Sequence, residues 1–115
     1  MNKDSALFLQ DILECIEKIE EYTAVLDFRG FESNTQIQDS VLRRLEIIGE
    51  AAKNVPSSFR GKHPQIPWKK ISGMWDVLIH SYSGVSLRTV WEVIRKDIPT
   101  LKQETKQLLK KQPLQ

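Results

Sequence analysis

The sequence has few of the residue types that join parts of a small protein through disulfides or metal ions. It contains one cysteine, Cys15, and two histidines, His63 and His80. A single cysteine cannot form a disulfide within the chain, and such usage is typical of the reducing cytoplasm. Neither Cys-x-x-Cys nor His-Glu-x-x-His occurs, and the histidines have no metal-ligand spacing with the acidic residues. We therefore expect no metal site and no cofactor.

Other absences narrow the possible functions further. There is no glycine-rich phosphate loop, so nothing local supports nucleotide hydrolysis. No uncharged apolar run approaches the roughly 18 residues that span a bilayer, and the N-terminus turns acidic too early for a secretory signal. We therefore expect a cytoplasmic protein without a membrane segment. Cys15 lies in an acidic, helix-like stretch that disfavours thiolate, which indicates a core position and not a catalytic thiol.

The net charge of +2 conceals an uneven distribution along the chain. Residues 1–32 hold eight acidic and three basic side chains, a local charge of −5, and the remainder holds seven acidic and fourteen basic side chains, a local charge of +7. A basic body attracts polyanions, of which nucleic acid is the commonest.

Apolar residues recur with helical spacing in the first half of the chain. The pattern predicts a first helix at about 5–28, ended by Gly30. Ser33 and Gln36 resemble a capping box that opens a second helix running to about Asn54. The residues expected to face the core of these helices are Ile12, Ile16, Ile19, Thr23, Leu26, Ile37, Val41, Leu45, Ile48 and Ala52.

Proline and serine punctuate the second half. Pro56 ends the second helix, and residues 56–66 form a loop with at most one short turn. Pro67 opens a third helix, Ser86 caps a fourth and Pro99 starts the last one. No stretch alternates with period two, so we predict an all-α, antiparallel bundle of four to five helices forming a single domain over residues 1–115. The apolar positions are Trp68, Ile71, Trp75, Leu78, Ile79, Tyr82, Val90, Trp91, Ile94, Ile98, Leu101, Leu108 and Leu109.

His80 is the group on the third helix best suited to acid–base chemistry near neutral pH. Asp76 precedes it by four residues on the same helical face and could accept a hydrogen bond from the imidazole. Tyr82 follows near the helix end, where its hydroxyl could reach solvent. From spacing alone, a partly buried histidine satisfied by an aspartate is the preferred interpretation of the cluster, and a catalytic site is the alternative.

Three segments, read in order, resemble the HepT family of HEPN ribonucleases. Residues 66–82 read IPWKKISGMWDVLIHSY, residues 43–52 read RRLEIIGEAA, and VWE followed by DIPTL comes downstream. The resemblance covers nearly the whole chain. It implies a HEPN-like fold, usually a homodimer in which two copies of the motif form a joint cleft for RNA. It also implies a metal-independent endoribonuclease, the toxin of a type VII toxin–antitoxin pair.

The family motif runs from an arginine with a polar residue beside it to a histidine, one further residue and a tyrosine. These positions map here to Trp75, Asp76, His80 and Tyr82. In that scheme His80 acts on the attacking ribose 2′-hydroxyl or on the leaving oxygen. The missing arginine would hold the scissile phosphate and stabilise its developing charge.

Trp75 is a departure from this pattern, because tryptophan offers one neutral donor and no charge. Loss of a phosphate-binding charge commonly lowers a rate about 10²–10³-fold. We therefore expect an impaired enzyme. A detoxifying mutation is the preferred origin of Trp75, a natural variant is the alternative, and a third interpretation is that the ring completes the apolar stripe.

The resemblance also implies a partner, an MntA-like nucleotidyltransferase antitoxin that transfers AMP onto the motif tyrosine, here Tyr82. The added negative charge would repel RNA phosphates. Alternatively, Tyr82 only closes the apolar stripe. A second candidate function is a non-catalytic helical module that docks the nucleotidyltransferase, and a third is a helical dimer with no site.

Basic side chains flank the motif and could contact the phosphate backbone of an RNA substrate, such as tRNA. For any single one of them, a solvated helix face is the preferred interpretation. The candidates are Lys69, Lys70, Arg88, Arg95 and Lys96.

Overall fold

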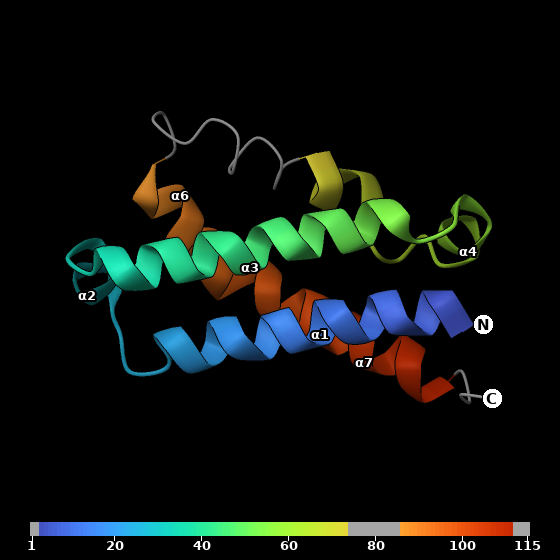
Figure 1. The fold of residues 1–115 in the computed structure, drawn as a ribbon, viewed down its shortest axis with the longest axis horizontal. Coiled ribbons are helices and arrows are strands. Elements are labelled where there is room, and N and C mark those ends of the chain that lie inside the picture. Colours follow the sequence, from blue (N-terminus) through green and yellow to red (C-terminus); the bar gives the residue numbers. More distant parts are fainter. Residues whose placement is uncertain (1–2, 74–85, 112–115) are drawn as a thin grey trace.

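The computed structural model describes residues 3–73 and 86–111. All regular elements within these ranges are helices. The two longest, α1 (Lys3–Thr23) and α3 (Thr35–Asn54), lie side by side and run antiparallel (Figure 1). Each is amphipathic, so their apolar faces can be buried against each other and against a further helix.

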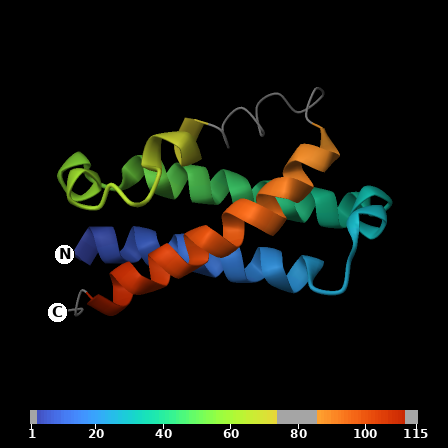
Figure 2. The same cartoon turned by 180° about the vertical axis from the view of Figure 1, so that it is seen from behind.

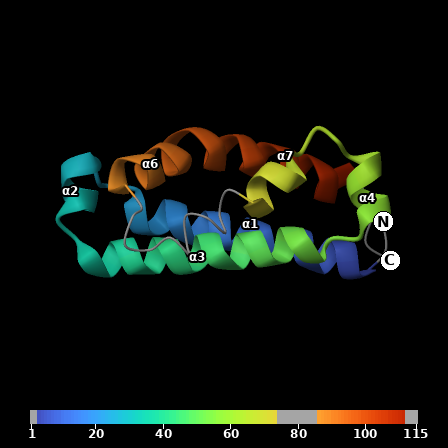
Figure 3. The same cartoon turned by 90° about the horizontal axis from the view of Figure 1, so that it is seen from above.

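The third long element is one helical run made of α6 (Leu87–Glu92), the π-helical turn η2 (Val93–Asp97) and α7 (Ile98–Lys111). Seen from behind, it crosses α1 and α3 obliquely (Figure 2). Seen from above, α1 and α3 form one layer and this run forms the other (Figure 3). The prediction of an all-α helical bundle is confirmed.

The prediction that Pro99 starts a separate helix is wrong, because Pro99 is the second residue of α7 and the chain is already helical before it. Inside an α-helix the proline ring clashes with the carbonyl four residues earlier, which here belongs to Arg95. The wider π turn η2 ends two residues before the proline, includes Arg95, and changes the spacing of the carbonyls there. Proline therefore accompanies a local widening here and does not break the helix.

Two short helices complete the ends of the bundle. α2 (Phe28–Glu32) joins α1 to α3 at one end, and α4 (Ser57–Lys62) follows α3 at the other. α4 is the one short turn allowed for in the predicted loop. Residues 68–73 are helical as well, so the expected third helix begins next to Pro67.

The boundary between the first two predicted helices is corrected. The first helix stops at Thr23, and Gly30 does not end it but lies inside α2. A separate short helix forms because Asp27 accepts a hydrogen bond from the Gly30 amide at 2.9 Å, while the Gln38 side chain donates to the carbonyls of Phe31 and Glu32. These polar side chains satisfy groups at both ends of α2.

The cap of α3 also differs from the prediction. Asn34, and not Ser33, is the N-cap, and its side chain accepts from the Ile37 amide at 3.0 Å. Ser33 is the C-cap of α2. Asparagine caps a helix as well as serine does, so the predicted capping box of Ser33 and Gln36 was one residue out of register.

A continuous apolar core lies between the two layers. A half-buried ion pair, Lys102 Nζ to Glu20 Oε1 at 2.7 Å, joins α7 to α1 at its edge, but pairs of this kind contribute little compared with the core. Of the inward positions predicted within the described ranges, all are buried except Ile37, Leu26 and Leu109, which are half-buried. The three long helical elements contribute to this core the residues Leu9, Ile12, Ile16, Ile19, Val41, Leu45, Ile48, Ala52, Val90, Trp91, Ile94, Ile98, Leu101 and Leu108.

Candidate functional site

The four predicted motif residues Trp75, Asp76, His80 and Tyr82 lie outside the described residues. The structure does describe the two helices on either side of this segment in the chain. The contacts of these two helices show which side chains hold the residues before and after the motif segment, and which charged groups lie near them in the chain.

On the N-terminal side, Trp68 anchors the helical residues 68–73. Its ring is buried and its Nε1 donates to the His63 carbonyl at 2.9 Å. The Phe59 ring lies 6.3 Å from the Trp68 ring and 4.4 Å from the His63 ring, measured between centroids. His63 is therefore part of an aromatic cluster that fixes this turn.

On the C-terminal side, Ser86 caps α6 as predicted. Its hydroxyl accepts from the Thr89 amide at 3.4 Å, and its carbonyl accepts from the Val90 amide at 3.2 Å. Val90 and Trp91 follow directly and are buried in the core. Both ends of the motif segment are thus held by side chains that the sequence pattern identified as apolar anchors or caps.

Arg88 and Arg95, two of the predicted phosphate contacts, belong to an arginine–aromatic stack. The Arg88 guanidinium lies 3.8 Å from the centroid of the Phe28 ring, and the Arg95 guanidinium lies 4.4 Å from that of Trp91. The two rings meet edge to face at 6.5 Å. Arg95 also donates to the Leu26 carbonyl at 2.7 Å. Both guanidinium groups therefore have structural roles, although the side chains are exposed.

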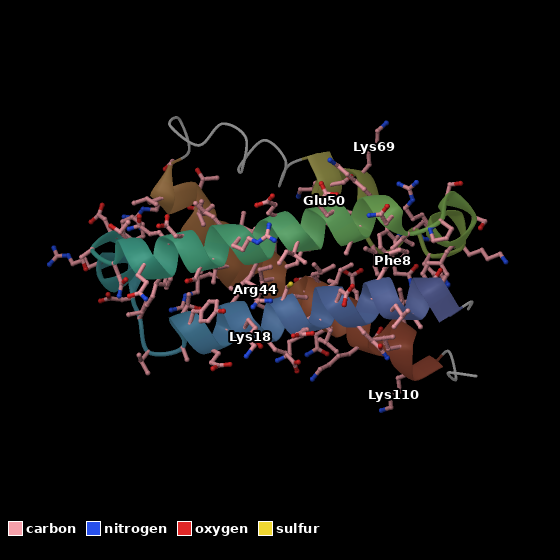
Figure 4. The ribbon with its side chains drawn as sticks, viewed as in Figure 1. Phe8, Lys18, Arg44, Glu50, Lys69 and Lys110 are labelled. Carbon is pink, nitrogen blue, oxygen red and sulfur yellow. The ribbon has the colours of Figure 1, made fainter. Side chains whose placement is uncertain are left out.

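Lys69 and Lys70, the other two phosphate candidates of the motif region, are exposed. Figure 4 shows Lys69 pointing away from the bundle. The helical residues 68–73 that carry them lie toward the α4 end, whereas α6 lies toward the α2 end (Figures 1 and 3). The four cations therefore form two separate groups, one before and one after the motif segment in the chain. Lys96, on η2, is exposed too.

A surface groove of about 350 Å³ opens beside the lysine group. One wall comes from the helical residues 68–73 and the turn before them, through Gln65, Pro67, Lys70 and Ile71. The groove thus reaches the same helical turn that leads into the motif.

The opposite wall is one face of the long C-terminal helix, formed by Asp97, Thr100, Leu101 and Glu104. These positions are spaced as one face of a helix requires. Partial burial raises the pKa of Glu104 above its ordinary value of 4.5. The sequence analysis did not identify this wall. The signal for it was the helical spacing of two carboxylates, Asp97 and Glu104, on either side of the apolar Leu101.

Arg44 is a second residue without a predicted role. It is half-buried between α1 and α3 (Figure 4), where its guanidinium lies 3.9 Å from Cys15 Sγ. Burial raises the pKa of the Cys15 thiol, and the nearby Arg44 only partly opposes this. The prediction that Cys15 is a core residue is confirmed, and its thiol is poorly suited to nucleophilic chemistry.

Within residues 3–73 and 86–111, no three histidine, cysteine or acidic side chains converge to hold a metal ion. None of the helices in those ranges combines the length and apolarity needed to cross a membrane.

Comparison with known proteins gives consistent matches. The ribonuclease HepT-like family matches residues 12–108. A protein of Thermococcus cleftensis named probable ribonuclease HepT is 44% identical over 110 residues, which are 96% of this chain and 100% of that protein. A candidate RNase of Caldanaerobacter subterraneus subsp. tengcongensis is 44% identical over 105 residues, or 91% of this chain and 94% of that protein.

A longer relative comes from Methanocaldococcus jannaschii and is named as a gamma-glutamylcyclotransferase and candidate RNase. It is 52% identical over 104 residues, which are 90% of this chain and 47% of that protein, so this chain spans about half its length. No solved structure gives a significant match. Since the family match covers most of the sequence and the Thermococcus cleftensis relative aligns over its full length, the chain belongs to the ribonuclease HepT-like family.

Proposed function

We propose that this chain is the toxin of a type VII toxin–antitoxin pair, a metal-independent endoribonuclease weakened by Trp75. Membership of the ribonuclease HepT-like family is the observation that carries the proposal. The relatives of similar length are named as ribonucleases, which supports the same activity here.

The chemistry assigned to the motif needs no metal. The ribose 2′-oxygen attacks the adjacent phosphorus and the bond to the 5′-oxygen breaks, which leaves a 2′,3′-cyclic phosphate and a 5′-hydroxyl. His80 takes the proton from the 2′-hydroxyl or supplies one to the leaving oxygen, and Asp76 orients the imidazole. With Trp75 at the arginine position, the charge that develops on the phosphate has no cation from that residue, and we expect a loss of about 10²–10³ in rate.

RNA would be held by cations on both sides of the motif segment. Lys69 and Lys70 are exposed on one side, and Arg88 and Arg95 are fixed on aromatic rings on the other. A guanidinium stacked on a ring keeps N–H groups at its edge that can donate to phosphate oxygens. The separation of the two groups suits an extended strand that crosses the motif, and binding through them should weaken as salt increases.

Control of the toxin is assigned to Tyr82. In this proposal an MntA-like nucleotidyltransferase antitoxin transfers AMP to the phenolic oxygen, and the added phosphate repels RNA. The proposed active form is a homodimer in which two copies of the motif form a joint cleft for RNA. Its proposed location is the cytoplasm.

A second candidate function is a non-catalytic module that docks the nucleotidyltransferase. One observation favours it: Trp75 removes the charge on which catalysis depends, while the rest of the family pattern is retained.

The test is cleavage of a tRNA-containing RNA mixture without metal, by this chain and by Trp75→Arg. Cleavage that appears or rises at least about 100-fold in Trp75→Arg, and is lost when His80→Ala is added, supports the ribonuclease. No cleavage by a folded Trp75→Arg dimer would overturn it and favour the docking module.

A further inference from the structure

The groove between the helical residues 68–73 and the C-terminal helical run has a floor and a rim of different chemistry. Ile71 and Leu101 are almost fully buried, with 5% and 4% of their surface exposed, and supply an apolar floor. Lys70 at the rim is a cation, and Asp97 and Glu104 are carboxylates. A ligand that fits must combine an apolar face with donors for the carboxylates and an acceptor for the ammonium group.

A nucleobase has this combination. Its flat face can lie on apolar side chains while its edge forms hydrogen bonds, which is how proteins read unpaired bases in RNA. The groove volume of about 350 Å³ is within the range of sites for small ligands, roughly 300–1,000 Å³.

Among the four bases, guanine matches this lining best. Its N1–H and its amino group point the same way, so they can donate together to the two oxygens of one carboxylate, while O6 can accept from a lysine. Cytosine and adenine offer a carboxylate only their amino group, and uracil offers only N3–H.

The two carboxylates lie too far apart to share one base edge. Asp97 and Glu104 are seven residues apart on one helical face, which corresponds to about 10 Å along the axis. They must therefore meet different parts of a nucleotide. Partial burial raises the pKa of Glu104, and a partly desolvated carboxylate gains most from two N–H donors.

The position of Asp97 supplies an independent observation. Asp97 is the last residue of the π turn η2, and single π turns within helices are frequent at functional sites. This turn changes the register of the helix just where the wall of the groove begins. The residues of η2 also include Arg95, which contacts Trp91 and Leu26.

We propose that this groove binds a guanine nucleotide of single-stranded RNA, with Glu104 reading the N1–H and amino edge, Lys70 donating to O6, and Asp97 accepting from the ribose 2′-hydroxyl. The proposal rests on the proposed ribonuclease function, since it names the base preferred next to the motif. The groove would make the enzyme selective for guanine at one position of its substrate.

The test uses the full ¹⁵N-labelled chain, titrated with 5′-GMP, 5′-AMP, 5′-CMP and 5′-UMP in metal-free buffer and followed by NMR. We expect GMP to shift amides of residues 65–71 and 97–104 and to bind about tenfold or more tightly than the other three nucleotides. The 2′-deoxy form of GMP should bind about fivefold more weakly than GMP, because Asp97 loses its donor.

Glu104→Gln should remove the preference for GMP while the spectrum stays that of a folded protein. Glu14→Gln, which changes an exposed carboxylate on α1, is the matched control and should keep it. Equal affinities for all four nucleotides, or shifts confined to the region around Arg88 and Arg95, would overturn the proposal.

The outcome is independent of catalysis, because binding is measured on the chain with Trp75 present. Guanine binding in the groove with no cleavage by Trp75→Arg would contradict the ribonuclease function and support the guanine site. Cleavage by Trp75→Arg without preferential binding of GMP would support the ribonuclease function and contradict the guanine site.

Discussion

The two ends of the bundle place positive charge in contrasting surroundings. At the α2 end, Arg88 and Arg95 lie on the rings of Phe28 and Trp91 in the arginine–aromatic stack. At the α4 end, Lys70 stands beside a groove with carboxylates across from it. Stacked guanidiniums are fixed in place and contribute to the fold, whereas a lysine beside an open groove is available to a ligand.

One helical run serves both ends. η2 places Arg95 against Trp91 and Leu26, while Asp97, at the end of the same π turn, lines the groove. A regular α-helix would turn these residues differently, because a π turn inserts extra backbone into the helix. The contrast between a structural end and a ligand-binding end can be broken or sharpened by substitution at each.

The largest effect on stability is expected at the structural end, from Phe31→Ala. The Phe31 side chain is fully buried, and its ring lies 5.3 Å from that of Trp91. Removal of a buried aromatic ring costs about 3–5 kcal/mol, which should be measured as a lower free energy of unfolding in urea. Leu7→Ala, at a half-exposed position, should change it by no more than about 0.5 kcal/mol. Similar losses for both variants would contradict the account.

An intermediate effect is expected for Arg95→Ala. The substitution removes the contact with the Trp91 ring and the hydrogen bond to the Leu26 carbonyl, which together contribute about 1–2 kcal/mol. The same urea titration measures it, with the exposed neighbour Lys96→Ala as the control. If Arg95→Ala were as stable as that control, Arg95 would have no structural role and the contrast between the ends would disappear.

The smallest effect is expected in the groove, from the pH dependence of stability. Because burial raises the pKa of Glu104 above 4.5, the folded state binds that proton more tightly than the unfolded state does. Glu104 therefore lowers the free energy of unfolding progressively as pH rises through 4.5 and then through its folded pKa. The difference between Glu104→Gln and the parent should grow across this interval and then level off. Parallel pH profiles would show that the carboxylate is fully solvated.

The sequence predicted the helical class and nearly all of the core, because amphipathic spacing in Ile12–Ile19 or Val41–Ala52 reflects burial directly. It failed at Gly30 and Pro99, where local propensity suggested helix ends. At Gly30 the side chains of Asp27 and Gln38 hold a separate short helix, and at Pro99 the π turn accommodates the ring. Such compensation depends on contacts and backbone register that residue propensities do not include.

The candidate site was predictable only in part. Family resemblance located Trp75, Asp76, His80 and Tyr82 in the chain, and these assignments remain predictions. The aromatic partner of Arg88 is Phe28 of α2, which is distant in sequence, so a pattern along one helix could not reveal that contact. Trp91 and Arg95 are four residues apart in one helical run, a spacing from which their contact could have been predicted. The helical spacing of Asp97 and Glu104 was visible in the sequence, but the groove was missed because its other wall lies about thirty residues away in the chain.

The central claim is that this chain carries a metal-independent ribonuclease site disarmed at Trp75. It is tested most directly by the ends of the RNA fragments that Trp75→Arg produces in the presence of a metal chelator. The account predicts 2′,3′-cyclic phosphate and 5′-hydroxyl ends, at a rate that His80→Ala abolishes. Fragments with 3′-hydroxyl and 5′-phosphate ends, or no fragments from a correctly folded Trp75→Arg protein, would contradict it.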